Sequence, residues 1–324
     1  VALLRTLQRW FDTASTEGAA DQAQRGDRID WMRALPFALL HIGCLGVVWV
    51  GVSWTAVCVA LTLYAVRMFA ITAFYHRYFS HRTFQTSRAV QFLFAVVGAS
   101  SVQRGPLWWA AHHRNHHKLS DQEGDVHSPV LEGFWYSHMG WLFDDTAGTD
   151  YSRIQDFAKY PELVWLNKYF LVPPVLLGVA CTLIAGWPGL LIGFFFSTVL
   201  CWHITFLVNS LAHVSGKRRF ETTDQSRNNW LIALLTLGEG WHNNHHHYQS
   251  STRQGFYWWE IDMTYYGLKA LSAVGLVWDL REPPARVLEE GRANDAAIKA
   301  AKKASKKAAR LGLPVEPEFE PAAE

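Results

Sequence analysis

The chain has 324 residues, of which 50% are hydrophobic and 14% aromatic, and its 30 Lys and Arg nearly balance its 28 Asp and Glu. A net charge of +2, without a groove pattern of basic and aromatic residues, argues against a nucleic-acid partner. All four cysteines fall in apolar stretches, which excludes a disulfide framework and a thiolate metal site.

Four apolar segments follow in two pairs along the chain. They cover about 35–50, 54–75, 170–185 and 190–213. Because a helix needs ~20 largely apolar residues to cross a hydrocarbon core about 30 Å thick, we predict an all-α membrane protein with four transmembrane helices in two hairpins. The alternative is a soluble protein with buried helices. Sixteen tryptophans, several near the segment ends, favour the membrane because aromatic belts mark its interfaces.

The basic residues predict the orientation of these helices. The turns at 51–53 and 186–189 contain no Lys or Arg, whereas the 76–168 region contains nine, the first 34 residues five and the part after His213 fifteen. The positive-inside rule therefore predicts that both termini and the middle region are cytoplasmic. Residues 1–34 are polar, show no signal-peptide pattern and are expected to form a cytoplasmic segment.

Arg67 is the one basic residue inside a predicted transmembrane helix. An isolated charge there costs about 2.5–3.5 kcal/mol on insertion scales. We expect Arg67 to snorkel toward the cytoplasm or to face the helix bundle, in a structural rather than a catalytic role.

The last segment, 283–324, is rich in Ala and Lys and is expected to be a flexible cytoplasmic tail. Within it, Ala296–Arg310 favours a helix that has no large apolar face. Such a helix would either rest on anionic lipid or stay in solvent.

Histidines are concentrated in short clusters at the ends of the apolar segments. The first has H-x4-H spacing, two have H-x2-H-H spacing, and one histidine follows an asparagine by a single helical turn. Residues i, i+3 and i+4 share one face of a helix, so we expect each triplet to converge on one point. The resulting nitrogens exceed the places of a single site, which predicts two metal ions. The expected ligands are His76, His81, His113, His116, His117, Asn209, His213, His242, His245 and His246.

Iron is the metal that these residues favour. The clusters contain no cysteine ligand, which argues against structural zinc and against an iron–sulfur cluster. They also lack the H-E-x-x-H motif that would indicate zinc-dependent hydrolysis. An all-imidazole site with open positions suits iron or copper used with O₂. We therefore predict two Fe ions as cofactor and O₂ as co-substrate.

Other polar residues near the clusters are expected to support the ligands rather than to bind metal. Metal-binding histidines usually donate their second N–H to a carboxylate or carbonyl. The candidates are Asp121, Asp125, His127 and Glu239, and the alternative for the loop is a solvated acidic segment. The histidines that do not fit a ligand pattern are His41, His112, His203 and His247, and His138 lies in the loop after the second cluster.

These motifs resemble those of the membrane fatty acyl desaturases, in particular the acyl-CoA Δ9, stearoyl-CoA-type group in a bacterial form. The boxes read H-R-x-x-S-H, H-R-x-H-H and H-N-x-H-H. The flanking sequences Gly105-Pro-Leu-Trp-Trp109, Gly238-Glu-Gly-Trp-His242 and Trp258-Trp-Glu-Ile-Asp262 are similar as well. Val126 stands where proline is usual. The resemblance covers roughly 30–282, which places an integral-membrane desaturase domain at 35–282.

The resemblance implies four transmembrane helices under a cytosolic helical cap, a di-iron centre and a kinked tunnel for the acyl chain. It places the nine histidines on ligand positions and Asn209 on a position that reaches one iron through water. The implied substrate is a fatty acyl-CoA or an acyl-lipid, which would gain a cis Δ9 double bond. A separate ferredoxin-type or cytochrome b5-type donor with an NAD(P)H reductase would supply electrons, and the implied location is a bacterial inner membrane.

Three other functions stay open at this point. A membrane hydroxylase, ketolase or decarbonylase can carry similar histidine boxes, and its products would identify it. A zinc-dependent hydrolase would need no O₂. A binding protein that catalyses no reaction would not explain why the chain carries ten potential metal ligands.

Overall fold

The computed structural model describes residues 31–143 and 148–311. These residues are predominantly helical, which agrees with the helical part of the predicted fold class, and one short antiparallel pair joins β1 (Gln85–Thr86) to β2 (Val277–Trp278). The predicted cytoplasmic segment 1–34 lies almost wholly outside the described residues. The elements that do not belong to the two long apolar pairs are α5 (Arg88–Ala99), α6 (Pro106–Leu119), α7 (Pro129–Glu132), α8 (Phe134–His138), η3 (Gly140–Phe143), η4 (Tyr151–Arg153), α9 (Gln155–Ala158), α10 (Pro161–Lys168), α14 (Trp230–Leu235), α15 (His242–His247), α16 (Met263–Ala273) and α17 (Ala285–Arg310).

The first apolar pair begins with α2 (Trp31–Cys44) and α3 (Val47–Val50). After a turn at Gly51, which has φ of +72°, it continues in α4 (Trp54–Phe69) and the π-helix η2 (Ala70–Ser80). Ser53 caps α4 by accepting the Ala56 N–H at 3.1 Å. The helical run ends at Ser80 rather than near 75, so His76 lies on its last turns.

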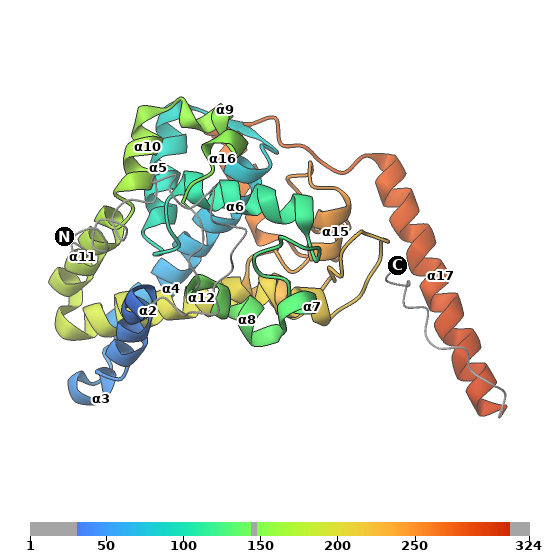
Figure 1. Ribbon diagram of the computed structural model, residues 1–324, viewed down its shortest axis with the longest axis horizontal. Coiled ribbons are helices and arrows are strands. Elements are labelled where there is room, and N and C mark those ends of the chain that lie inside the picture. The colour runs from blue at the N-terminus through green and yellow to red at the C-terminus, as the bar shows by residue number, and fades with distance from the viewer. Residues whose placement is uncertain (1–30, 144–147, 312–324) are drawn as a thin grey trace.

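The second apolar pair is one run made of α11 (Val172–Pro188), η5 (Gly189–Phe196), α12 (Ser197–Asn209) and α13 (Leu211–Val214). Ala185 and Gly186 have non-helical backbone angles, and Gly186 has φ of +61°, a conformation that favours glycine. The bend therefore lies slightly before the predicted turn at 186–189. Figure 1 shows the chain changing direction between α11 and α12.

Two helical runs are long and apolar enough to cross a membrane, Trp54–Ser80 and Val172–Val214, whereas the apolar helix Ala34–Val50 is shorter. Only 44% and 22% of their most apolar windows are buried, although a core helix of a soluble protein would be mostly buried. Trp49, Trp54 and Leu183 are each more than 80% exposed. These observations support lipid contact, and the number of membrane crossings stays a prediction.

Arg67 faces the helix bundle, one of the two placements expected for it. Its side chain is buried and donates to the Ser197 hydroxyl at 2.6 Å and the Thr198 hydroxyl at 2.7 Å. These bonds connect α4 to the η5–α12 junction. Arg67 therefore has a structural role, because its hydrogen bonds hold the two apolar pairs together; we call this contact the Arg67 clamp.

A single large core joins η2 to the helices that follow it. Phe74, Phe79, Leu107, Leu163 and Leu268 are buried together in this core, which holds α5, α6, α10 and α16 around η2. The burial of these large side chains fixes η2 and α6 relative to each other. Both elements carry histidine clusters.

Part of the predicted tail forms α17, and its first turns pack against the rest of the molecule. Val287 and Gly291 are buried, and Asp295 pairs with Lys217 at 2.5 Å and with Arg219 at 3.1 Å. The second half of α17 extends away from the other helices (Figure 1). The helix over Ala296–Arg310 agrees with its predicted helical preference.

Candidate metal centre

The π-helix η2 explains the H-x4-H spacing of the first cluster. The backbone N–H of His81 donates to the His76 carbonyl at 3.2 Å, five residues back. Such i→i+5 bonding brings two histidines five positions apart onto nearby faces. Their ring centroids lie 4.9 Å apart.

The structure corrects the prediction that each H-x2-H-H triplet converges on one point. The nine histidines form two groups, and in each the potential ligand atoms lie within 4.8 Å of one another. In a helix, positions i and i+4 differ by about 40° and positions i+3 and i+4 by about 100°. Each triplet therefore splits between the groups. The five-histidine group is His76, His81, His113, His117 and His245, and the four-histidine group is His116, His213, His242 and His246.

The Nε2 atoms in each group point at one another. Two ligands at right angles on an ion with bonds of about 2.1 Å would lie about 3.0 Å apart. The measured Nε2–Nε2 distances are 3.0 Å for His76–His245, 3.0 Å for His117–His245, 2.9 Å for His81–His113 and 3.0 Å for His213–His242.

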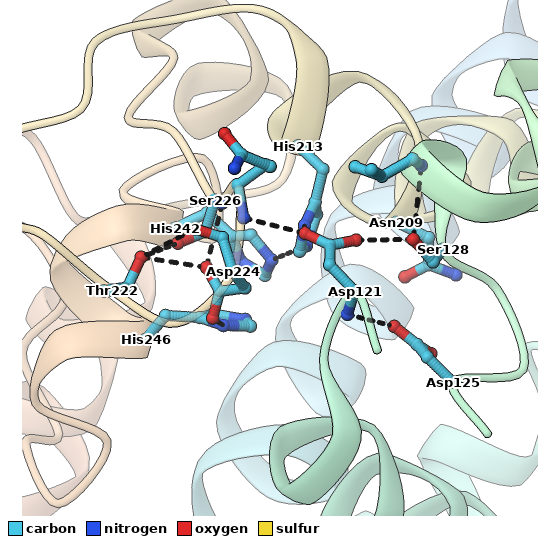
Figure 2. A network of polar contacts seen from close by, with 12 residues as sticks. Asp121, Asp125, Ser128, Asn209, His213, Thr222, Asp224, Ser226, His242 and His246 are labelled. Atoms are coloured by element: carbon cyan, nitrogen blue, oxygen red, sulfur yellow. Dashed lines mark hydrogen bonds and ion pairs between the residues drawn. The ribbon is translucent and has the colours of Figure 1, made fainter. Parts of the chain in front are cut away.

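Aspartates orient three rings of the four-histidine group, and Figure 2 shows two of these pairs. The Nδ1 atoms donate at 3.1 Å from His116 to Asp125, at 2.8 Å from His213 to Asp121 and at 2.6 Å from His246 to Asp224. Two of these aspartates were predicted from the loop after the second cluster. Sequence reasoning missed Asp224, because it lies 22 residues before His246 and outside every histidine motif.

Glu239 orients one ring of the five-histidine group. It accepts a hydrogen bond from His76 Nδ1, and it also pairs with the buried Arg77 at 3.0 Å. Arg77 in turn pairs with Asp262 at 3.0 Å. The arginine of the H-R-x-x-S-H motif thus holds a carboxylate against the histidine that precedes it.

Most of these histidines are kept neutral, which is the form that binds a metal ion. Burial and neighbouring imidazoles hold the pKa well below its ordinary value in His81, His113, His117, His242 and His245. Burial lowers the pKa of His246 to about 4, although Asp224 opposes this shift.

The donor set fits a transition-metal ion in each group. Among the described residues, no hydrogen-bond partner meets the buried Nε2 of His246, whose Nδ1 is held by Asp224. A buried polar atom without a partner costs about 1–3 kcal/mol, so this nitrogen is placed as a ligand would be. Imidazole suits iron, copper, nickel and zinc.

A cavity of about 210 Å³ opens beside the five-histidine group and is lined mainly by apolar and aromatic side chains. His113 forms part of its wall, together with His127 and Asn209. Asn209 ends α12 one turn before His213, and its role as a ligand stays a prediction. His127 packs its ring 4.4 Å from that of His116, with its Nδ1 3.7 Å from Asp125.

The histidines set aside as ligands lie outside both groups. His112 bonds through Nδ1 to the Trp108 carbonyl at 2.9 Å. His247 stacks on Phe220 with ring centroids 3.9 Å apart. His203 bonds to His41 through one ring nitrogen and to His138 through the other.

Comparisons with known proteins bear on this centre. A family model described as fatty acid desaturase matches residues 52–278, more than half of the chain. The palmitoyl-monogalactosyldiacylglycerol delta-7 desaturase, chloroplastic, of Arabidopsis thaliana is 42% identical over 204 residues, 62% of this chain and 55% of that protein. The acyl-CoA C20 Delta5-desaturase of Anemone leveillei is 38% identical over 205 residues, 62% of this chain and 65% of that protein. The sn-2 palmitoyl-lipid 9-desaturase of Nostoc sp. (strain 36) is 34% identical over 215 residues, 64% of this chain and 75% of that protein. The chain thus spans less than two thirds of the first two relatives.

Proposed function

Because the chain belongs to the fatty acid desaturase family, we propose that it is an O₂-dependent desaturase of saturated fatty acyl chains with two iron ions as its cofactor. The reaction removes two hydrogens from adjacent methylenes. It consumes one O₂, two electrons and two protons, and it yields one double bond and two waters. The electrons come from a separate ferredoxin-type or cytochrome b5-type donor with its reductase.

The observation that carries this proposal is the contact between the apolar cavity and the five-histidine group at His113. An unactivated methylene offers no group for acid–base chemistry, so iron, when bound, would supply the oxidising power. The chain's own task is geometric. Trp109, Trp202 and Phe206 form apolar walls that hold a hydrocarbon chain and exclude water.

Within this function we propose a cis Δ9 double bond and an acyl-CoA carrier, from the resemblance of the histidine boxes and their flanking motifs. The names of the relatives include delta-5, delta-7 and 9-desaturases and both acyl-CoA and acyl-lipid enzymes. The position of the bond and the carrier therefore need separate measurements.

We also propose that the two apolar pairs cross the membrane as hairpins, with the histidine groups and both termini in the cytoplasm. The distribution of Lys and Arg supports this orientation. The acyl chain would then reach the cavity from the lipid phase, where it partitions. A bacterial inner membrane is the proposed location.

The test is expression of the full chain in a host without desaturases, supplied with iron and an electron donor. Gas chromatography with mass spectrometry would locate double bonds and hydroxyl groups in the host's fatty acids. Monounsaturated chains with the bond at C9 support the proposal, and a bond elsewhere corrects only its position. Hydroxylated products would identify a hydroxylase instead. His116→Ala is the inactive control.

A further inference from the structure

The two histidine groups differ in the carboxylates behind their rings. Three of the four rings in the four-histidine group have an aspartate at Nδ1. Within the described parts of the chain, one of the five rings in the other group has a carboxylate there. The aspartates are Asp121, Asp125 and Asp224, and the single carboxylate is Glu239.

These carboxylates also differ in what else they bind. Glu239 forms an ion pair with the fully buried Arg77, with 3.0 Å between Arg77 Nη2 and Glu239 Oε1. Asp121 is held instead by uncharged donors, the Ser128 hydroxyl at 2.6 Å and the Gln225 N–H at 2.7 Å. A neutral hydrogen-bond donor fixes a carboxylate without cancelling its charge.

Asp224 follows the same pattern as Asp121. It accepts the Ser226 N–H at 2.9 Å and the Thr222 hydroxyl at 3.0 Å (Figure 2). Neutral donors thus hold Asp224 in the same way as they hold Asp121.

The two histidine groups also differ in how far their side chains are exposed to solvent. All members of the four-histidine group are buried, whereas His81, His113 and His117 of the other group are partly exposed. His113 also lines the apolar cavity. While no acyl chain fills the cavity, small chelators therefore reach the five-histidine group more easily.

We propose that the four-histidine group is the tight, slowly exchanging metal position and that the five-histidine group is the weaker, exchangeable one. This inference rests on the proposed two-metal centre. A carboxylate makes its imidazole more basic, and losing such a partner typically costs 10–100-fold in metal affinity. The additional imidazole favours the five-histidine group, but three aspartate pairs and complete burial outweigh it.

The experiment follows iron loss from the full chain in lipid nanodiscs. Purified protein loaded with iron is mixed with a soluble chelator, and iron per chain is measured over time. We expect two phases of one ion each. Asp224→Asn should accelerate the slow phase about 10–100-fold and leave the fast phase unchanged. Glu239→Gln is the matched variant, because it also replaces one carboxylate behind one ring by an amide, and it should accelerate only the fast phase.

A single phase in the wild-type protein, or a faster slow phase in Glu239→Gln, would overturn the inference. Glu239 also binds Arg77, so folding of that variant is checked by circular dichroism. If it does not fold, Asp121→Asn and Asp224→Asn decide the question, since both must accelerate the slow phase. Wild-type protein that folds but binds no iron would contradict the proposed function instead.

Discussion

The Nε2 atoms of His41 and His203 lie 2.9 Å apart, although 162 residues separate them in the sequence. The other nitrogen of His203 lies 3.0 Å from His138, whose second nitrogen lies 3.0 Å from the Ser210 hydroxyl. This chain of imidazoles ties α2 to α12 and α8. Both nitrogens of His203 are used in it, so its rings do not converge on a single point as metal ligands would.

We expect His203→Leu to lower stability without removing metal. The substitution leaves the partly exposed His41 and the buried His138 each without a partner for one nitrogen, and the loss at the buried His138 should cost about 1–3 kcal/mol. The melting temperature should fall, while iron per chain stays at the wild-type value. His116→Ala, which removes a member of the four-histidine group, should lose iron. Equal iron loss in both variants would contradict the distinction between the two sets of histidines.

A second prediction concerns Arg67 and its two hydroxyl acceptors. Removing the acceptors should lower the free energy of unfolding more than removing the arginine does. The Ser197 and Thr198 hydroxyls also donate to the Gly193 and Phe194 carbonyls of η5, so both hydroxyls keep partners in Arg67→Met. The double substitution Ser197→Ala and Thr198→Val instead removes the two closest acceptors of a buried guanidinium, which keeps only its longer bonds to the Leu63 carbonyl at 3.1 Å and the Ser100 carbonyl at 3.4 Å. We expect it to cost about 1–3 kcal/mol or more, and Arg67→Met to cost less. Thermal unfolding in detergent measures both, and the reverse order would contradict the clamp.

Much of the centre could be predicted because its signals are local in the sequence. The apolar segments gave the two long helical runs, and histidine spacing indicated which residues share a helix. Asp121 and Asp125 lie within nine residues of the second cluster, where a search for supporting carboxylates begins. Such short-range patterns depend only on helix geometry.

Other features depend on contacts between distant segments. Asp224 reaches His246 because Thr222 and Ser226 shape the loop around it, and no periodic pattern marks such a loop. The π-helix η2 is buried in the large core, and no short sequence pattern distinguishes a π-helix from an α-helix there. The division of each triplet between two groups likewise requires knowing what faces each side of the helix.

The packing of α17 leads to a pH-dependent prediction. Asp295 pairs with Lys217 and Arg219, and although burial opposes ionisation, these partners hold its pKa below the ordinary 3.8. Because the pKa is lowered in the folded state, the stabilisation is present above about pH 4 and is lost as pH falls through the folded value. Asp295→Asn should cost about 1 kcal/mol at pH 7 and less at pH 3.

Hydrogen exchange measures this effect locally. Amides in α17 should exchange faster in Asp295→Asn than in wild type at pH 7, and the difference should shrink at low pH. Glu289→Gln is the control, since Glu289 is exposed on the same helix. A difference that does not depend on pH would show that the ion pairs do not hold α17.

The cavity gives the last prediction, which concerns acyl chain length. Leu142 lines the cavity on η3 and is not part of either histidine group. Replacing it with tryptophan fills part of a space of about 210 Å³, so Leu142→Trp should lower conversion of 18-carbon chains more than of 14-carbon chains. Product analysis of mixed acyl chains measures this ratio, and iron per chain should not change. Leu93→Trp, at an exposed position on α5, is the control. An unchanged ratio in Leu142→Trp would show that the acyl chain does not occupy this cavity.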